Sequence, residues 1–444
     1  MKHFDLFVIG TGSAGFAAAH QARKNGLKVG IADELQFGGT CALRGCNPKR
    51  LLAGASELIT RINHMKNKGI EGNININWSE LIQFKRKMTQ TTPVYAESLG
   101  DKIGAEKFHG HCRFSGKNTL VIGEKEEVSA DHILIATGST PAKLNIPGAE
   151  NIITSDEYFE LTALPKRLLF IGGGYISFEL AHVAAQAGAE VVIIEARDKV
   201  LGNFDQDLVK MFLDANELEG VKVYTNAPLV SVEKGGDEFY VHAGEKRIKT
   251  DLIVHGAGRV PQIGGLDLHA ADILTDDKGI VVNEFLQSES NQSVYIAGDV
   301  NPEGVQLTTV AEMEGQIAAH NIIHGNDKTP GYDLLSSVVF SFPQLAYAGF
   351  TEQQAMAKGI EFDTQFIDTS HRHITRRLGL THSAFKVLVG KYGRIIGAHM
   401  IGYNCDEVIN PLLFAIAQKA TVRDLKGMNF TFPSVLHDMV HRLA

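Results

Sequence analysis

Apolar residues recur along the chain in two patterns: short runs typical of buried strands, and longer stretches with helical periodicity. The run over residues 4–9 is followed by a glycine-rich turn, a helical stretch over 16–25 and a second apolar run over 27–32. The same order returns at Leu168, where a strand leads through a glycine turn and a helical stretch into a strand over 190–194. The pattern therefore predicts two β-α-β units related by an internal duplication.

Further secondary structure follows each unit. Helical patterns cover residues 51–68 and 78–99, and a strand-rich stretch follows over 107–135. After the second unit, another helical pattern covers residues 307–324. From Gly331 onward strands and helices alternate without a glycine turn of the phosphate-binding kind, which predicts a separate C-terminal domain.

The first glycine turn has the form G-x-G-x-x-G and reads Gly10-Thr11-Gly12-Ser13-Ala14-Gly15. Its three glycines permit, in order, the tight turn, the approach of the backbone to a pyrophosphate, and the close packing of helix on strand. The N-terminus of the helix that follows faces the phosphates. Asp33 ends the second strand, where an acid can bond a ribose hydroxyl. These features predict a dinucleotide site.

The second glycine turn reads Gly172-Gly173-Gly174-Tyr175-Ile176-Ser177. Here Glu195 ends the second strand. An acid at this place accepts hydrogen bonds from both ribose hydroxyls and repels a 2′-phosphate, which favours NADH over NADPH. Arg197 and Lys199 follow closely, and such a basic cluster can accept a phosphate, so NADPH stays open as the alternative.

Cys41 and Cys46 follow a glycine pair just downstream of the first unit. With four cysteines in all, the chain is not a secreted disulfide scaffold, and a close pair in a cytoplasmic protein favours a catalytic dithiol fed with electrons by a bound flavin. The thiolate is the nucleophile, and we expect a helix N-terminus to lower its pKa. The alternative is two buried thiols that never pair. Cys112 and Cys405 lack such neighbours and are predicted to be core thiols.

Charge and hydropathy exclude several classes of protein. The formal net charge is −8 and no long basic run occurs, which argues against nucleic-acid binding. No apolar run is long enough to predict a membrane span, and the N-terminus has no signal-peptide pattern, so we expect a cytoplasmic protein. His109 and His111 lie on one face of a predicted strand and Cys112 lies on the opposite face, so the three do not converge and no metal site is predicted.

The ordered set of motifs resembles the pyridine nucleotide–disulfide oxidoreductase family, the group of glutathione reductase, dihydrolipoamide dehydrogenase and mercuric reductase. The motifs are G-x-G-x-x-G, G-G-T-C-x4-C-x-P, A-T-G, the second glycine turn and A-G-D. The resemblance implies an α/β fold with two Rossmann-like dinucleotide-binding domains and a C-terminal α+β dimerisation domain. The implied ranges are 1–150 and 265–330 for the two parts of the FAD-binding domain, 151–264 for the NAD(P)-binding domain and 331–444 for the dimerisation domain.

The resemblance also implies roles for individual residues in a homodimer that binds FAD in the first unit and a nicotinamide in the second. Cys46 contacts the flavin as the charge-transfer thiolate, and Cys41 attacks the incoming disulfide. Lys49 pairs with Glu179 beside flavin N5, where a cation favours the anionic reduced ring. Tyr175 covers the flavin and moves when the nicotinamide enters. Further implied cofactor contacts are Gly39, Thr40, Thr137, Gly138, Gly258, Gly298 and Asp299.

One departure from the family pattern lies near the C-terminus. The family carries a His-Pro motif whose histidine, from the partner subunit, protonates the leaving thiolate, and a glutamate five residues later orients it. Here Phe432 stands in place of the histidine and His437 in place of the glutamate. Phenylalanine cannot transfer a proton, so either His437 has taken over the acid–base role or the substrate needs no such acid. The plain alternative is that His437 is a partly exposed helix residue.

We therefore predict an FAD-dependent NAD(P)H:disulfide oxidoreductase that acts through the Cys41–Cys46 disulfide on a small-molecule or small-protein disulfide. Two alternatives stay open. One is a flavin-dependent reductase of metal ions, quinones or oxygen, although mercuric reductases have a C-terminal cysteine pair and this chain ends His441-Arg442-Leu443-Ala444. The other is a redox-sensing or partner-binding flavoprotein without turnover.

Overall fold

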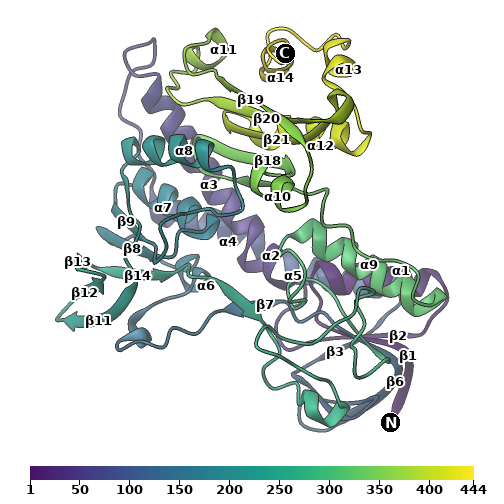
Figure 1. Ribbon diagram of the computed structural model, residues 1–444. Helices are drawn as coiled ribbons and strands as arrows, with labels where there is room; N and C mark the ends of the chain where they lie inside the picture. Colours follow the sequence, from purple (N-terminus) through teal and green to yellow (C-terminus); the bar gives the residue numbers. More distant parts are fainter. The chain divides into compact units, whose positions relative to one another are not determined.

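The computed structural model describes residues 1–444 and divides into two compact units, which are described separately (Figure 1). The first unit comprises Met1–Pro48, Phe84–Ala142 and Gly258–Tyr332. The second comprises Lys49–Gln83, Lys143–Ala257 and Asp333–Ala444. Helices α3 (Cys46–His64) and α4 (Trp78–Thr89) carry the chain from the residues of one unit into those of the other.

The first unit contains a mixed sheet in the order β3-β2-β1-β6-β5-β4, with β16 also paired to β6. Strands β3, β2, β1, β6 and β16 pair in parallel, and β4 and β5 add an antiparallel edge. A separate two-stranded sheet joins β7 to β15. The strands are β1 (Lys2–Ile9), β2 (Val29–Asp33), β3 (Glu106–His109), β4 (Cys112–Gly116), β5 (Thr119–Ile122), β6 (Glu126–Ile135), β7 (Ser139–Pro141), β15 (Arg259–Pro261) and β16 (Val294–Ile296).

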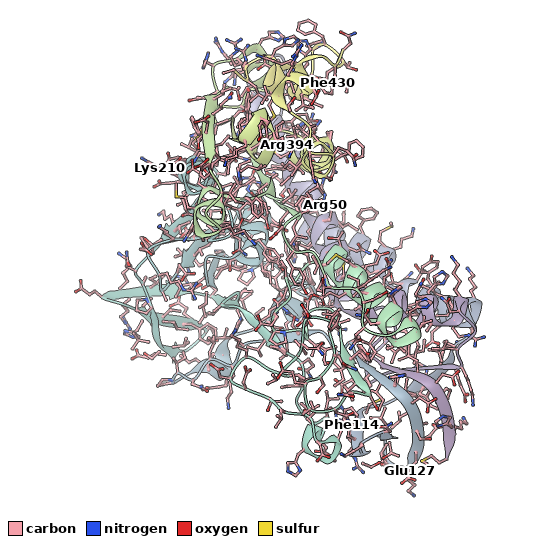
Figure 2. All side chains as sticks on the ribbon, turned by 45° about the vertical axis from the view of Figure 1, so that its right-hand side comes forward. Arg50, Phe114, Glu127, Lys210, Arg394 and Phe430 are labelled. Atoms are coloured by element: carbon pink, nitrogen blue, oxygen red, sulfur yellow. The ribbon has the colours of Figure 1, made fainter.

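Strand β1 is apolar on both faces because both faces of the sheet are covered. Leu6 and Val8 enter one core and Phe7 and Ile9 the other. Phe114 is buried in the second core, whereas Glu127 on the adjoining part of the sheet is exposed (Figure 2). The helices of this unit are α1 (Ser13–Lys24), α2 (Gly39–Arg44), α5 (Thr92–Ile103), the short 3₁₀ helix η2 (Leu268–Ala271) and α9 (Thr308–His324).

Helices α1 and α9 lie against each other beside this sheet (Figure 1). The face of α1 that packs inward is made of alanines, which let another backbone approach closely. At the crossing, a Cβ added to Gly315 would lie 2.2 Å from the carbonyl oxygen of Ala14. Only glycine at position 315 therefore allows this contact.

The second unit begins with a parallel sheet in the order β10-β9-β8-β14, followed by an antiparallel sheet, β11-β12-β13. Helices α7 and α8 pack on the parallel sheet through a core that includes Phe178 and Phe212. The elements are η1 (Ala149–Asn151), α6 (Ser155–Tyr158), β8 (Arg167–Ile171), α7 (Tyr175–Gln186), β9 (Glu190–Ile194), α8 (Gln206–Leu218), β10 (Val221–Tyr224), β11 (Leu229–Gly235), β12 (Glu238–Ala243), β13 (Lys246–Thr250) and β14 (Leu252–His255).

The C-terminal part of the second unit is an antiparallel five-stranded sheet in the order β17-β18-β21-β20-β19. Helix α12 packs on it through a core that includes Ile409 and Leu412. The elements are β17 (Ser336–Val339), β18 (Gln344–Gly349), α10 (Glu352–Ala357), β19 (Phe362–Asp368), α11 (His373–Arg376), β20 (Ala384–Gly390), η3 (Lys391–Gly393), β21 (Ile395–Gly402), α12 (Cys405–Ala417), α13 (Val422–Lys426) and α14 (Val435–Val440).

The α/β fold class predicted from the sequence is confirmed, with two β-α-β units and an α+β segment at the C-terminus. None of the helices combines the length and the apolar composition that a bilayer-spanning helix requires.

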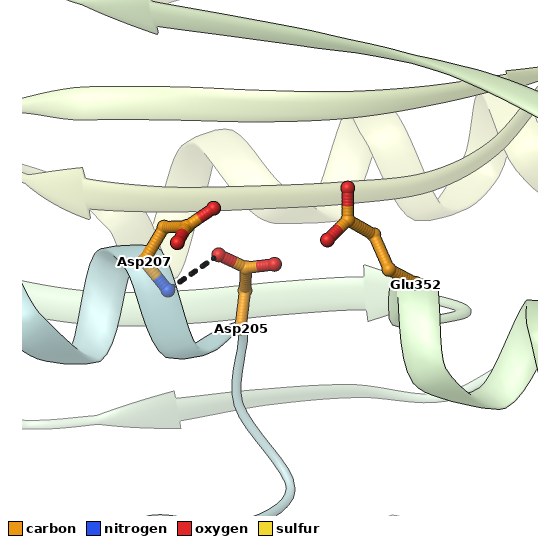
Figure 3. Close-up of side chains that lie close together, drawn as sticks. All are labelled: Asp205, Asp207 and Glu352. Carbon is orange, nitrogen blue, oxygen red and sulfur yellow. Dashed lines mark hydrogen bonds between the residues drawn. The ribbon is translucent and has the colours of Figure 1, made fainter.

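Three carboxylates of the second unit converge, as Figure 3 shows for Asp205, Asp207 and Glu352. The cation between them is the ammonium of Lys386 on β20, whose Nζ lies 2.8, 2.7 and 3.0 Å from the three groups in that order. The Lys386 side chain is only 3% exposed. Although burial lowers its pKa, the hydrogen bonds from Nζ to the three carboxylates raise it above the ordinary lysine value overall. This salt-bridge cluster joins the first turn of α8 to the C-terminal sheet.

We predict that Lys386→Met destabilises the protein by about 3 kcal/mol at neutral pH, because removing one partner of a buried ion pair leaves its carboxylates uncompensated. The measurement is the urea midpoint of unfolding. The pKa of Glu352 is held below its ordinary value, since the bonds from Thr364 and Lys386 outweigh the effect of burial. The stability this gives is present above the ordinary glutamate pKa and is lost as the pH falls, so the gap between variant and wild type should narrow in acid.

Lys391→Met is the matched control, because its partner Glu361 and Lys391 itself are both largely exposed. A Lys386→Met midpoint equal to that of the control would contradict the prediction.

Candidate active site

The first glycine turn packs closely against the backbone of two neighbouring segments, and we call the resulting hollow the first cradle. Gly10 has φ = +107°, and a Cβ on it would lie 2.2 Å from the carbonyl oxygen of Ala136. A Cβ on Gly39 would lie 2.6 Å from Cα of Gly12. Gly12 caps α1 without a side-chain hydrogen bond, so the first backbone N–H groups of α1 are left for an anion. The turn thus has the space and the donors that a pyrophosphate needs.

Asp33 lies at the end of β2, as the sequence predicts, and its carboxylate holds the glycine turn. One oxygen accepts hydrogen bonds from the backbone N–H (2.9 Å) and hydroxyl (2.7 Å) of Thr11. The other oxygen accepts from the backbone N–H of Leu35 at 3.0 Å. Each carboxylate oxygen can accept two bonds, so a ribose hydroxyl can still bind the second one.

The second glycine turn repeats this design. Gly172 has φ = +97°, and a Cβ on it would lie 2.4 Å from the carbonyl oxygen of Gly256. Glu195 accepts hydrogen bonds from the backbone N–H groups of Gly173 at 2.7 Å and Arg197 at 2.9 Å. Both acids that end a second strand therefore also fix the glycine turn in front of them.

The two turns differ at their sixth position, where Ser177 replaces Gly15. Ser177 is fully buried, and a Cβ on Gly256 would lie 2.1 Å from its hydroxyl oxygen. In the first turn the residue that must lack a side chain is Gly15 on the helix, since a Cβ on it would lie 2.0 Å from the carbonyl oxygen of Gly10. In the second turn the residue that must lack a side chain is Gly256, which follows β14 and faces Ser177.

The A-G-D segment lies beside the first glycine turn. A Cβ on Gly298 would lie 3.0 Å from Cβ of Ala14. Asp299 accepts a hydrogen bond from the hydroxyl of Ser139 at 3.2 Å, and the guanidinium of Arg259 donates to the same hydroxyl at 2.9 Å. Burial raises the pKa of Asp299, whereas these two neighbours lower it in part. A carboxylate held this way is suited to accept a hydrogen bond from a polyol chain.

Glu314 on α9 holds the A-G-D segment from inside the protein. Its side chain is fully buried and accepts hydrogen bonds from the backbone N–H of Gly298 (2.7 Å), the amide of Asn301 (3.1 Å) and the hydroxyl of Tyr332 (2.6 Å). Burial raises the pKa of Glu314, and these three donors lower it in part. Because these three groups all donate to Glu314, they stabilise the ionised form of its carboxylate.

The two redox cysteines lie at the start of neighbouring helices. Cys41 is in α2, and Cys46 is the first residue of α3, which begins five residues before the helical run expected from Leu51. The hydroxyl of Thr308, the first residue of α9, donates to Sγ of Cys41 at 3.1 Å and lies 3.4 Å from Sγ of Cys46. One hydroxyl therefore contacts both sulfur atoms. Cys112 and Cys405 are buried, as expected of core thiols.

The expected lowering of the thiol pKa is wrong for Cys41. The neighbouring Cys46 sulfur, and then burial, raise the pKa of Cys41 above its ordinary value, and the bond from Thr308 lowers it only in part. The physical reason is that two sulfur atoms in contact cannot both carry a negative charge cheaply.

Lys49, Glu179 and Tyr175 meet in the second unit. Nζ of Lys49 lies 2.9 Å from a carboxylate oxygen of Glu179 and 4.6 Å from the centre of the Tyr175 ring. The other oxygen of Glu179 accepts the backbone N–H of Phe340 at 3.0 Å. Glu179 is fully buried and Lys49 is nearly so, and removing either partner would leave the other charge uncompensated. Arg50, labelled in Figure 2, stacks on the Phe340 ring and bonds Asp406 at 3.0 Å.

Three further sequence-predicted residues lie around the pairing of β7 with β15. Thr137 donates its hydroxyl to the carbonyl oxygen of Gln262 at 2.5 Å. Gly138 and Gly258 both have positive φ, and each offers its carbonyl oxygen to the neighbouring segment. The remaining predicted residues occupy the first turns of helices, at Ser13 and Ala14 of α1, Thr40 of α2 and Ile176 of α7.

The C-terminal residues adopt a short helix. Phe432 is 76% exposed, and the His437 ring lies edge-on to it with the centroids 5.0 Å apart. The His441 ring lies 4.2 Å from that of His437, one helical turn further on. His437 is partly exposed, and its backbone N–H is capped by the hydroxyl of Ser434 at 3.2 Å. The structure thus places the imidazole of His437 against the exposed Phe432 ring.

The sequence places His109, His111 and Cys112 on one strand, and the structure does not. His109 ends β3, His111 lies in the turn that follows, and Cys112 begins β4. The turn separates them because Gly110 has φ = +141°. His109 contacts Glu97 at 3.2 Å and His111 contacts Glu34 at 2.7 Å.

Sequence reasoning missed Thr11, Ser139, Thr308 and Glu314. Three of them are hydroxyl residues without a motif of their own, and they are found only when distant segments meet. Glu314 carried a weak signal, because it is an acid on the apolar side of a helix and lacks a basic neighbour at helical spacing.

The residues present fit two dinucleotides. Each glycine turn has a backbone cradle that a Cβ would fill, and each is followed by an acid that ends the next strand. The two cysteines of the predicted dithiol lie in the same unit as the first turn.

Comparison with known proteins gives the same answer. A family model described as pyridine nucleotide-disulphide oxidoreductase matches residues 4–315, and the model of that family's dimerisation domain matches residues 335–442. The chain is 33% identical over 439 residues to a mercuric reductase of Bacillus cereus, which covers 95% of this chain and 68% of that protein. It is 31% identical over 458 residues to a glutathione reductase of Nostoc sp., which covers 98% of both chains.

The fold also matches a solved structure, the Cu(II) complex of the HOCl-induced flavoprotein disulfide reductase RclA from Escherichia coli. The TM-score is 0.89, the sequence identity is 23%, and the match covers 100% of both chains. FAD and NAD(P)H are the cofactors expected of this family. The motifs, the two cradles, the dithiol and the matched domains lead to one conclusion: the chain belongs to the pyridine nucleotide–disulphide oxidoreductase family and is an enzyme of the flavoprotein disulfide reductase kind.

Proposed function

We propose that this enzyme uses NAD(P)H to reduce a disulfide substrate through its own Cys41–Cys46 pair. The observation that carries the proposal is the contact of both sulfur atoms with one hydroxyl at the N-terminus of α9, in the unit that also contains the first dinucleotide cradle. Two thiols held in one place by a shared partner are suited to form and break a disulfide repeatedly.

In this proposal FAD is held by the turn from Gly10 to Gly15, by Asp33, by the loop at Gly39 and Thr40, and by Asp299. When bound, it accepts hydride electrons from the nicotinamide and delivers two electrons to the disulfide. Asp299 accepts a hydrogen bond from the polyol chain, and Glu314 keeps the Gly298 backbone in place. The second turn and Glu195 hold the nicotinamide dinucleotide.

The dithiol then performs two exchange reactions. Sγ of Cys41, as thiolate, attacks one sulfur of the substrate, forms a mixed disulfide and releases the first thiolate. Sγ of Cys46 attacks Sγ of Cys41, re-forms the Cys41–Cys46 bond and releases the second thiolate. The two protons of the reduced pair balance the two thiols produced. Gly45 lies between the two helices that carry the sulfurs, where a Cβ would lie 2.8 Å from the carbonyl oxygen of Thr40, so the loop stays compact.

Lys49, Glu179 and Tyr175 are proposed to serve electron entry. Lys49 lies three residues after Cys46 on the same helix, within one turn of the sulfur that contacts the flavin. Glu179 fixes the ammonium, so that its charge is available to the reduced ring. Tyr175 is partly exposed at the start of α7, next to the second cradle, where an aromatic ring can cover a cofactor.

The roles of the two cysteines are tested by spectroscopy. The reduced enzyme with bound FAD should show long-wavelength absorbance from contact between the Cys46 thiolate and the flavin. Cys46→Ser should abolish this band, whereas Cys41→Ser should retain it, because the donor sulfur remains. The measurement is a reductive titration followed by absorbance. A band that survives in Cys46→Ser would reverse the assignment.

The preference for NADH is tested at Glu195. We expect kcat/KM to be higher with NADH than with NADPH in the wild type, because this carboxylate repels a 2′-phosphate. Glu195→Gln keeps an oxygen that can accept the Gly173 bond but removes the charge. The substitution should lower the ratio of kcat/KM with NADH to kcat/KM with NADPH by about tenfold, equivalent to about 1.4 kcal/mol. Equal kcat/KM values with NADH and NADPH in the wild type would contradict this prediction. They would show that attraction of the 2′-phosphate by Arg197 and Lys199 outweighs its repulsion by Glu195.

The proton donor is tested at His437. We propose that it returns a proton to the first leaving thiolate in place of the missing histidine, so His437→Ala should flatten one limb of the pH–rate profile. His441→Ala is the matched control, since it removes the neighbouring ring and keeps His437. An unchanged profile in His437→Ala removes this residue from the mechanism.

A second candidate is the reduction of metal ions, quinones or oxygen, with the dithiol secondary. It is favoured by the exposed Phe432, which offers no proton to a thiolate, and by the likeness to mercuric reductases. NAD(P)H oxidation that persists in Cys41→Ser with such acceptors would support it. No steady-state oxidation with any acceptor would instead favour a redox-sensing or partner-binding flavoprotein.

We further propose that the enzyme works as a cytoplasmic homodimer. The match of residues 335–442 to a dimerisation domain supports the dimer. We also propose the division into FAD-binding segments 1–150 and 265–330, an NAD(P)-binding domain 151–264 and a dimerisation domain 331–444.

A further inference from the structure

The ring of His111 faces a hydrogen-bond acceptor with each of its two nitrogens. Nδ1 lies 2.7 Å from a carboxylate oxygen of Glu34, and Nε2 lies 2.9 Å from the carbonyl oxygen of Gly265. A carbonyl oxygen and an ionised carboxylate only accept hydrogen bonds, so each ring nitrogen must carry a proton. A neutral imidazole has one N–H and could satisfy only one of these partners. The arrangement therefore suits the charged ring.

Gly265 makes room for the imidazole. Its φ is +77°, and a Cβ on it would lie 2.7 Å from Nε2 of His111. A side chain at this position would clash with the ring and separate Nε2 from the carbonyl oxygen. The backbone nearby is joined as well, since the N–H of Phe114 donates to the carbonyl oxygen of Leu266 at 2.8 Å. The segment that carries His111 is thus fixed against the loop at Gly265.

The neighbouring groups favour the imidazolium form. The hydrogen bond to the Gly265 carbonyl oxygen, and then the bond to Glu34, raise the pKa of His111 above its ordinary value, whereas burial lowers it in part. The carboxylate of Asp267, just before η2, raises this pKa further. Glu34 and Asp267 are the charged groups that act on the ring.

His111 and the residue before it hold the part of the first cradle that faces a ribose. The backbone N–H of Gly110 donates to the carbonyl oxygen of Asp33 at 2.9 Å, and the ring of His111 binds the next residue, Glu34. Leu35 follows and donates its backbone N–H to the Asp33 carboxylate at 3.0 Å. Glu34 therefore lies between two residues that set the position of this carboxylate, and a bond to its side chain restrains both.

We propose that His111 is a positioning residue for FAD, whose imidazolium ring ties the segment after Asp33 to the loop at Gly265 and so keeps the Asp33 carboxylate in place for the ribose. The proposal rests on the proposed binding of FAD at the first cradle. The ring takes up one proton from solvent when it forms both bonds and returns it when one bond is lost. The tighter hold on FAD is therefore present at low pH and is lost as the pH rises through the raised pKa of His111.

The experiment measures how fast the purified holoenzyme releases FAD into cofactor-free buffer between about pH 6 and 9, from the flavin fluorescence of the filtrate. His111→Gln leaves a side chain that is neutral at every pH. At the low end of this range the variant should release FAD about threefold faster than the wild type, the size of effect that an exposed charge pair gives. At the high end, where the wild-type ring is neutral as well, the two rates should converge.

Glu34→Gln separates the two-sided bond from simple attraction between an imidazolium and the phosphates of FAD. The amide can donate to a neutral Nδ1, so an uncharged ring then satisfies both of its partners. We expect the pH step in the release rate to disappear in this variant, with slow release retained at high pH. A step that persists would overturn the proposal, because attraction by charge alone does not need the Glu34 carboxylate. Both side chains are partly exposed, so neither substitution opens a cavity in the core.

His109→Gln is the matched control, because His109 lies two residues before His111 and contacts Glu97. It should follow the wild type at every pH. If His111→Gln differed from the wild type by the same factor at every pH, or not at all, the proposal would be overturned, since the first result describes a structural role without titration. A wild-type protein that binds no FAD at any pH would overturn the proposed function and this inference together.

Discussion

Helix α9 makes three contacts on which the first unit's site depends, and all three follow from how closely it approaches α1. Gly315 lets the two backbones meet at Ala14. That approach brings Glu314, one residue earlier, to the Gly298 backbone, and brings the helix start at Thr308 to the sulfur pair. A larger residue at 315 would move all of these groups together, because a helix shifts as a rigid body. Cofactor loop and dithiol are therefore positioned by one packing contact.

Four acids show how a carboxylate that is wholly or partly buried is stabilised by its partners. Glu314 has three hydrogen-bond donors and Glu179 has an ammonium and a backbone N–H. Asp33 and Glu195 accept backbone N–H groups from the turns they face. Burying a carboxylate is costly unless each oxygen has a partner. The partners of Asp33, Glu195 and Glu314 include backbone N–H groups of the two glycine turns and of the A-G-D segment. The hydrogen bonds that offset the cost of burial therefore also hold these segments in place.

Much of the fold follows from the sequence because its signals are local. The two glycine turns, the acids at Asp33 and Glu195, and the cysteine pair each lie within one short segment. The order of the motifs then indicates the family. The apolar periodicity places the start of α3 at Leu51, whereas the helix itself begins at Cys46. Thr308 and Glu314 could not be assigned, because their partners are far away in sequence and threonine or glutamate in a helix has many ordinary uses.

The close contact between Ser177 and Gly256 limits which substitutions these two positions tolerate. The oxygen of Ser177 fills the space that a side chain at 256 would need. A methyl group at 256 is compatible with the turn only if the hydroxyl at 177 moves or is removed, because the Cβ of Ser177 itself would lie 3.4 Å away. The residues at 177 and 256 therefore constrain each other. The second cradle therefore tolerates change in pairs, whereas the first, where Gly15 meets backbone, tolerates none.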